Sequence, residues 1–140
     1  MKTGDLNADD LKGIGEGYLP GLLGIRFTSA GDGWIEAELA LRQELMAPNG
    51  YLHAGSVVTL ADTCCGIACV RALPEGAVNF TTVELKSNFL GTAREGVIEC
   101  RATVLHRGRT THVWDIHVTN EADELIAICR LTNMIIDLLS

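Results

Sequence analysis

The chain places a carboxylate, Asp62, inside a run of small apolar side chains, nine residues after a histidine, His53. An ionised carboxylate without a partner is strongly destabilised in apolar surroundings, so Asp62 must be solvated by a cleft, hydrogen-bonded or used in chemistry. A carboxylate can attack a carbonyl carbon as a nucleophile, or it can deprotonate water as a general base. A structural role, in which Asp62 bonds to Thr59 or Thr63 of the same run, is the competing interpretation.

The second chemical feature is the start of a helix. Turn residues end at Gly50, and a helix is predicted from Ala54 onward. The first N–H groups of a helix have no partner within the helix, and the helix dipole favours negative charge near them. The amides of Ala54 and Gly55 could therefore stabilise a carbonyl oxygen as it becomes negative. In a regular helix Asp62 lies roughly 13 Å beyond His53. Two solutions remain open: a site built between two subunits, or a loop that folds His53 back.

The elements that position these groups follow from hydrophobic periodicity and turn residues. A long helix, apolar around its whole circumference, is predicted over residues 54–72, and a strand hairpin over 24–41. A short helix is predicted over 8–18 with Asn7 as its cap, and three glycines weaken it. Four extended segments suit a meander of antiparallel strands: 78–90, 96–107, 110–120 and 124–137. A helix apolar on all sides needs a curved sheet, so we predict one α+β domain over residues 1–140 with about six strands.

Composition agrees with one globular domain and disfavours several classes of partner. The chain has 140 residues, of which 47% are hydrophobic, enough for a real core. Its formal net charge of −7 argues against general nucleic-acid binding and against anionic membranes, where basic residues supply most of the affinity. Five basic residues nevertheless fall in one short stretch, which could hold a phosphorylated ligand or carry ordinary solvated charges: Lys86, Arg94, Arg101, Arg107 and Arg109.

The cysteines are odd in number, lie in apolar runs and lack C-x-x-C spacing: Cys64, Cys65, Cys69, Cys100 and Cys129. We expect buried thiols in a reducing compartment. The N-terminus lacks an apolar signal core, and we expect no membrane span because Thr59, Asp62 and Thr63 interrupt the long helix. These features together predict a cytoplasmic protein. There is no zinc or Walker pattern, and His117 with Asp115 lacks a third metal ligand, so no metal site is predicted.

Three sequence blocks carry a resemblance to a known family. They read L-H-A-G-x-x-x-x-L-A-D, then V-E-L-K-S-N-F-L-G-T-A-R-E-G, then V-L-H-R-G-R, and the match runs from about residue 24 to the C-terminus. The set resembles the hotdog-fold acyl-CoA thioesterases, specifically the PaaI-like branch that includes phenylacetyl-CoA and 4-hydroxybenzoyl-CoA thioesterases. The resemblance implies a helix wrapped by an antiparallel sheet, and a homodimer with active sites at the subunit interface, commonly paired into a homotetramer. It also implies hydrolysis of an acyl-CoA thioester without metal or other cofactor, since CoA is part of the substrate.

The resemblance assigns site residues one at a time. Asp62 matches the family's acidic residue, which acts in different members as nucleophile or as general base. His53 matches the histidine before the helix, which has a positioning or hydrogen-bonding role. The amides of Ala54 and Gly55 match the place where the thioester carbonyl is polarised. Thr82 matches a serine or threonine that helps to place substrate or water across the interface.

Two departures from the family pattern concern the same site. The family reads H-G-G where this chain has Ala54, and many members have Asn or Gln where it has Ala47. Asn49, two residues later, could replace that side chain if the loop is shaped differently. A further matched stretch lies near bound CoA in related proteins and consists here of Arg107, Gly108 and Arg109.

The expected activity is therefore hydrolysis of an acyl-CoA to free acid and CoA, with an aromatic or a short to medium acyl group. Two alternatives remain. A hotdog dehydratase is the first, although its histidine-proline signature is not evident. A module that binds acyl-CoA without hydrolysing it is the second, and the alanines at positions 47 and 54 keep it open.

Overall fold

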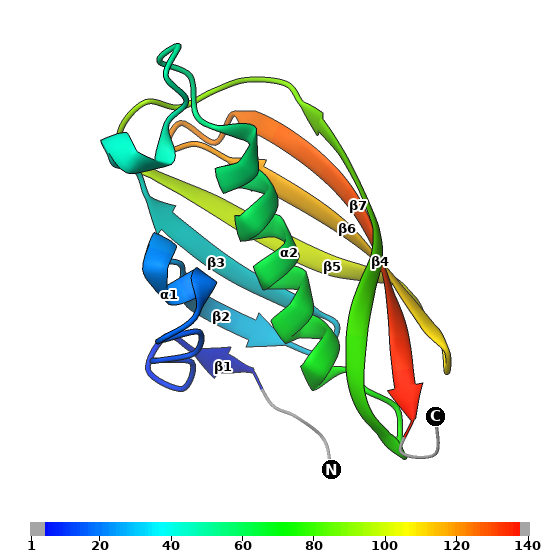
Figure 1. Ribbon diagram of the computed structural model, residues 1–140. Coiled ribbons are helices and arrows are strands. Elements are labelled where there is room, and N and C mark those ends of the chain that lie inside the picture. Colours follow the sequence, from blue (N-terminus) through cyan, green and yellow to red (C-terminus); the bar gives the residue numbers. More distant parts are fainter. Residues whose placement is uncertain (1–4, 138–140) are drawn as a thin grey trace.

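A computed structural model describes residues 5–137 as one long helix against a curved antiparallel sheet (Figure 1). In chain order the elements are β1 (Leu6–Asn7), α1 (Leu19–Leu23), β2 (Arg26–Gly31), β3 (Trp34–Ala40), a 3₁₀ turn (Gln43–Leu45), α2 (Ala54–Arg71), β4 (Ala77–Phe89), β5 (Val97–Arg107), β6 (Thr111–Thr119) and β7 (Leu125–Asp137). The predicted α+β class is confirmed. The sheet of the described part has seven strands rather than about six, because the two-residue β1 is added at one edge.

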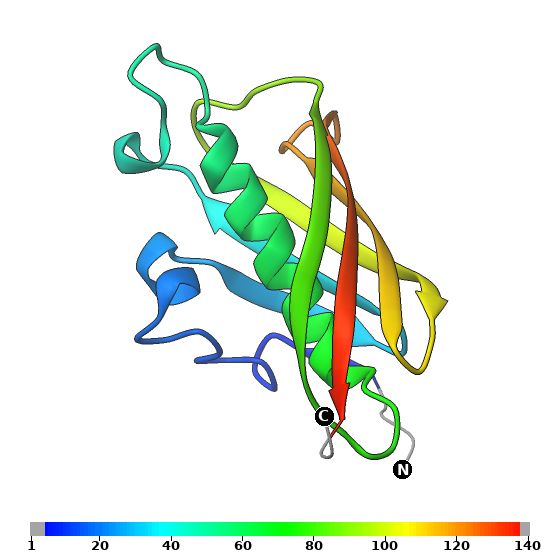
Figure 2. The ribbon, with the colours of Figure 1, turned by 45° about the vertical axis from the view of Figure 1, so that its right-hand side comes forward.

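The strand order is β1-β2-β3-β5-β6-β7-β4, and every neighbouring pair is antiparallel. The predicted meander therefore holds for β5, β6 and β7 but is wrong for β4, which pairs with β7 at the opposite edge from β1. The reason is the helix: α2 contacts β3 through β7, and the sheet reaches around it from both flanks (Figure 2). Because β4 lies at the edge opposite β1, the sheet covers more of the apolar circumference of α2 than a flat sheet would cover.

The core lies between α2 and the inner face of the sheet. Leu60, Cys64 and Cys65 of the helix are fully buried, as are Trp114 of β6 and Leu131 of β7. The helix also reaches the length and mean hydropathy of a membrane span, with 18 residues at 1.3. The expectation that no stretch is apolar enough was therefore wrong, because two threonines and one aspartate lower the average too little. Packing against five strands accounts for this hydropathy within the fold.

The helix predicted over residues 8–18 does not form. Gly13, Gly15 and Gly17 within it adopt left-handed backbone angles, with φ of +84°, +87° and +85°, and the segment runs as successive turns. Asn7 closes one of these turns with Asp10: each backbone N–H donates to the side-chain oxygen of the other residue, at 2.9 and 3.2 Å. The helical turn comes later, in α1, where a proline occupies the first turn.

Candidate active site

The start of α2 is built around His53, which is the N-cap residue. Its Nδ1 accepts a hydrogen bond from the backbone N–H of Gly55 at 2.7 Å. A neutral imidazole that accepts at Nδ1 carries its proton on Nε2, so the other edge of the ring is a donor. A Cβ at position 55 would lie only 2.9 Å from His53 Nδ1, which explains why glycine follows two residues after the histidine.

The amides at this helix start are not equivalent. Gly55 N–H is taken by His53, while Ser56 N–H and Val57 N–H donate to the His53 carbonyl at 2.9 and 3.4 Å. Among the described residues, Ala54 N–H has no hydrogen-bond partner. Ala54 also has an ordinary negative φ, because Asp123 is the one non-glycine residue with positive φ in residues 5–137. The alanine methyl therefore introduces no backbone strain, and its amide is available to an oxyanion.

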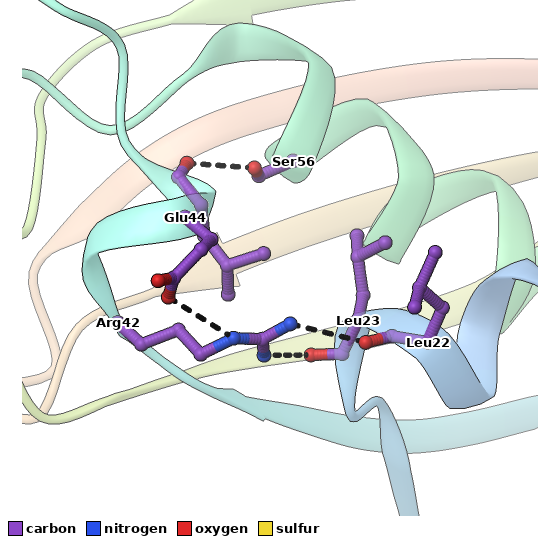
Figure 3. A network of polar contacts seen from close by, with 6 residues as sticks. Leu22, Leu23, Arg42, Glu44 and Ser56 are labelled. Carbon is purple, nitrogen blue, oxygen red and sulfur yellow. Dashed lines mark hydrogen bonds and ion pairs between the residues drawn. The ribbon is translucent and has the colours of Figure 1, made fainter.

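Ser56 helps to anchor this helix start from one side (Figure 3). The hydroxyl of Ser56, which is buried, donates to the Leu45 carbonyl at 2.8 Å, and His53 N–H donates to the same carbonyl at 3.2 Å. Arg42 lies next in this network: its Nε pairs with Glu44 at 3.6 Å, and its two Nη atoms donate to the last carbonyls of α1. The network connects α1 and the 3₁₀ turn to the first turn of α2.

Asp62 lies in the middle of α2 and is half-buried. Its Oδ1 accepts a hydrogen bond from Thr82 Oγ1 of β4 at 2.9 Å, so two residues expected to share a site are in direct contact. No hydrogen bond from another residue of the described part reaches Oδ2, and the exposed Thr82 leaves this side of the carboxylate open. The arrangement holds one carboxylate oxygen and leaves the other for a water molecule or a carbonyl carbon.

A buried polar row continues inward from this pair. Thr82, Asn133 and His112 are cross-strand partners on β4, β7 and β6. Each contacts one residue on the same face of α2: Thr82 contacts Asp62, Asn133 Oδ1 lies 3.7 Å from Cys65 Sγ, and His112 Nδ1 lies 3.4 Å from Cys69 Sγ. Asn133 and His112 are fully buried.

Sequence reasoning did not assign a role to Asn133 or His112. The available signal was that His112 shares its strand face with the apolar Trp114 and Ile116, which are also fully buried. Burial lowers the pKa of His112, and the charges of Arg107 and His106 lower it further. The row beneath Asp62 is therefore neutral at ordinary pH.

The remaining expected residues lie elsewhere in the chain. Asn49 is at the exposed tip of the loop formed by residues 46–53, and its Oδ1 accepts from Tyr51 N–H at 3.2 Å, within the loop itself. Ala47 donates its N–H to the Tyr51 carbonyl at 2.7 Å. Within one chain, the loop thus uses the Asn49 oxygen to shape its own turn.

The stretch expected near CoA forms the turn between β5 and β6, at the opposite end of the sheet from the start of α2 (Figures 1 and 2). Arg107 pairs with Asp32 at 3.1 Å, and Arg109 with Asp137 at 3.7 Å. Gly108 N–H donates to the Thr111 carbonyl at 2.9 Å and closes the turn. One chain thus separates its candidate groups into three places: the helix start, the Asp62 pair and this turn.

The predicted burial of the thiols is confirmed, because all five cysteines are free and buried. Burial raises the pKa of Cys69 to about 11 and raises that of Cys65 well above its ordinary range. Thiolates are the reactive form, so these side chains are poor nucleophiles near neutral pH. The carboxylate of Asp62 is the better candidate for the chemistry.

Comparison with known proteins identifies the family. The family model of the thioesterase superfamily matches residues 49–127. The 1,4-dihydroxy-2-naphthoyl-CoA hydrolase of Escherichia coli K12 is 32% identical over 131 residues, which cover 94% of this chain and 96% of that protein. A solved Pseudomonas aeruginosa thioesterase, with a glutamine replaced by alanine, has a TM-score of 0.88 and 30% identity, covering 95% of this chain and 96% of the other.

Two solved variants of a Staphylococcus aureus thioesterase are also similar. The variant with alanine in place of a glutamate has a TM-score of 0.83 and 27% identity, covering 86% of this chain and 100% of the other. The variant with alanine in place of a glutamine has a TM-score of 0.80 and 28% identity, covering 83% of this chain and 96% of the other. The resemblance found in the sequence is confirmed by these matches. The chain belongs to the thioesterase superfamily, with the hotdog fold, and it is a thioesterase.

Proposed function

We propose that this thioesterase hydrolyses an acyl-CoA ester between two subunits, with Asp62 of one chain acting on a carbonyl held by Ala54 N–H of the other. The observation that carries the proposal is the free Ala54 amide at the start of α2. The dipole of an 18-residue helix adds positive potential at this amide. A thioester carbonyl is already electrophilic, so one oriented donor, one carboxylate and one water are sufficient groups for hydrolysis.

Residue spacing in a relative supports the assignment of Asp62. In the Staphylococcus aureus thioesterase, the glutamine and the glutamate that were replaced by alanine stand fifteen residues apart. Ala47 and Asp62 are separated by the same fifteen residues in this chain. We take Asp62 as the counterpart of that glutamate and Ala47 as the counterpart of that glutamine. Ala47 has no side-chain amide to offer the substrate, so the proposed donors are Ala54 N–H and His53 Nε2.

The need for two subunits follows from distance. Ala54 and Asp62 lie on the same helix, and eight residues of α-helix span about 12 Å, too far for one carbonyl group to contact both. Within residues 5–137, β4 is an edge strand of 13 residues with one unpaired side. Its exposed side chains include Val78, Val83 and Phe89. A long edge strand with unpaired backbone groups and exposed apolar side chains favours pairing with another chain, so we propose that β4 pairs antiparallel with β4 of a second copy.

This dimer brings the third group of residues toward the site. A two-fold axis that pairs two β4 strands antiparallel also reverses the direction of α2. Ala54 of one subunit then lies at the same end of the dimer as the turn formed by Arg107, Gly108 and Arg109 of the second. We propose that this turn contacts the phosphates of CoA, and that two dimers associate into a homotetramer.

The proposed substrates are CoA esters of aromatic or short to medium acids. The Escherichia coli relative is a hydrolase of an aromatic acyl-CoA, which makes aryl-CoA esters the first choice. The test is release of CoA thiol, followed with a disulfide dye, on a panel of aryl-CoA and fatty acyl-CoA esters. Because the protein's own thiols are buried, they contribute little to the dye signal.

Asp62→Asn is expected to lower turnover at least about 100-fold, the usual contribution of a positioned general base. Its fold and its affinity for CoA should be retained, because Asn is isosteric and Asp62 is half-buried. The matched control is Asp115→Asn on the outer face of β6, where turnover should not change. Equal turnover by the native protein and Asp62→Asn would refute the assignment. Binding of the esters without thiol release by the native protein would refute the hydrolysis.

A further inference from the structure

The loop of residues 46–53 carries the proposed oxyanion amide at its end, and another segment holds it in place. Leu52 N–H donates to Thr92 Oγ1 at 3.0 Å. Arg94 Nε donates to the Gly50 carbonyl at 3.0 Å, and the Arg94 guanidinium lies 4.9 Å from the centre of the Tyr51 ring. These three contacts fall on consecutive residues of the loop, and all come from the segment that follows β4.

The holding segment is itself fixed to the sheet. The N–H groups of Leu90 and Gly91 both donate to the Ile126 carbonyl of β7, at 2.8 and 3.2 Å. Ala93, between the two contacting residues, packs against the hydrophobic core. A continuous set of contacts therefore leads from β7 through residues 90–94 to Leu52, which is two residues before Ala54. The loop tip is otherwise exposed at Pro48, Asn49 and Gly50.

We propose that Thr92 and Arg94 are positioning residues for the reaction: they fix the loop so that Ala54 N–H points at the thioester carbonyl. This role rests on the proposed function. An oxyanion donor is effective only when it lies about 2.7–3.1 Å from the developing charge. A displacement of about 1 Å at a catalytic group can cost about 100-fold in rate. Leu52 N–H donates to Thr92 rather than to a residue of its own loop, so Thr92 fixes this part of the loop to residues 90–94.

The experiment compares Thr92→Val, which removes the hydroxyl, with Thr92→Ser, which keeps it. For the aryl-CoA ester that the native protein hydrolyses best, Thr92→Val should lower kcat about 10- to 100-fold and change KM less than about threefold. Thr92→Ser should return kcat to within about threefold of native. Arg94→Met should lower kcat by about tenfold. Thr103→Val, at an exposed position of β5, is the matched control and should leave both constants unchanged.

Amide hydrogen exchange provides a readout that does not depend on turnover. Thr92→Val should speed exchange at Leu52 N–H and leave the exchange of β6 amides as in the native protein. A native kcat in Thr92→Val, or a Thr92→Ser variant no better than Thr92→Val, would overturn the positioning role. If Thr92→Val does not fold, Arg94→Met decides. Native exchange at Leu52 N–H together with a native kcat in Arg94→Met would overturn the positioning role. Absence of Asp62-dependent turnover in the native protein would instead refute the proposed function, together with this role.

Discussion

At the scale of single residues, the contact between Asp62 and Thr82 is the central contact of the proposed site. The threonine hydroxyl holds Oδ1 of the carboxylate at 2.9 Å and thereby orients the free Oδ2. Because Thr82 is exposed on an edge strand, its hydroxyl adds little to folding. Its contribution should therefore be visible in catalysis rather than in stability.

Thr82→Val should lower kcat/KM about tenfold, which corresponds to about 1.5 kcal/mol for a hydrogen bond to a charged group. The melting temperature should stay within about 2 °C of native, as for other surface substitutions. Thr81→Val is the control, because Thr81 is the neighbouring residue and points to the opposite face of the strand. Steady-state kinetics on one aryl-CoA ester measures both variants. Equal losses in the two would show that the hydroxyl of Thr82 has no special role.

The buried His112 predicts how stability depends on pH. Its pKa is lowered from 6.5 in the folded protein, mainly by burial, so the unfolded chain binds a proton more readily. The free energy of unfolding should therefore fall as pH drops below about 6.5, by at most about 1.4 kcal/mol per pH unit from this one group. In urea denaturation between pH 5 and pH 8, His112→Gln should show a smaller decrease toward low pH. His106→Gln removes one of the charges that lower the pKa of His112, so its decrease should lie between those of the native protein and His112→Gln. An unchanged slope in His112→Gln would contradict the prediction.

At the scale of elements, an irregularity in β4 gives Thr82 its direction. The register with β7 shifts between Thr82 and Glu84, so Val83 is an extra residue without a cross-strand partner. The shift lets Thr82 face Asp62 while Leu85, three residues later, also packs toward the core. A regular strand would turn one of these two side chains to the outer face. Bulges of this kind commonly re-aim a side chain beside an active site.

The free edge of β4 is tested with Val83→Arg. Val83 is 52% exposed, and a charged side chain there should oppose pairing of two β4 strands. In sedimentation analysis the native protein is expected to form the proposed homotetramer and the variant a smaller species. The variant should also lose thioesterase activity, because the proposed site needs two chains. Leu105→Arg, an exposed position of β5, should change neither property. A fully active monomer of Val83→Arg would rule out a site shared between subunits.

At the scale of the whole molecule, the two faces of the sheet carry different kinds of side chain. The inner face packs on α2 and supplies the core, including the polar row that ends at Asp62. The outer face carries ion pairs, among them Arg101 with Glu36 at 3.1 Å and Arg130 with Asp115 at 3.7 Å. The chain has 11 lysines and arginines against 18 aspartates and glutamates, and two of the basic residues stand in the β5–β6 turn proposed for CoA. Binding of an anionic substrate thus depends on where these charges lie rather than on the total charge.

Local features could be predicted from the order of residues in the chain. The apolar run with Asp62 predicted α2 to within one residue at its C-terminal end, and alternation with turn residues predicted β4 to β7 to within one or two residues at each end. The resemblance pointed to the thioesterase family and to the residues His53, Ala54 and Asp62. These features depend on neighbours a few positions apart, which a pattern in the chain records directly.

Which of these groups come into contact depends on the three-dimensional fold. The crossing of β4 to pair with β7, the contact of Asp62 with Thr82 and the burial of His112 and Asn133 all depend on residues far apart in sequence. The left-handed glycines that replace the helix over 8–18, and the use of the Gly55 amide by His53, are local features that the sequence patterns did not specify. Periodicity specifies the face on which a side chain lies. Strand order, register and the curvature of the sheet around α2 specify what lies opposite it.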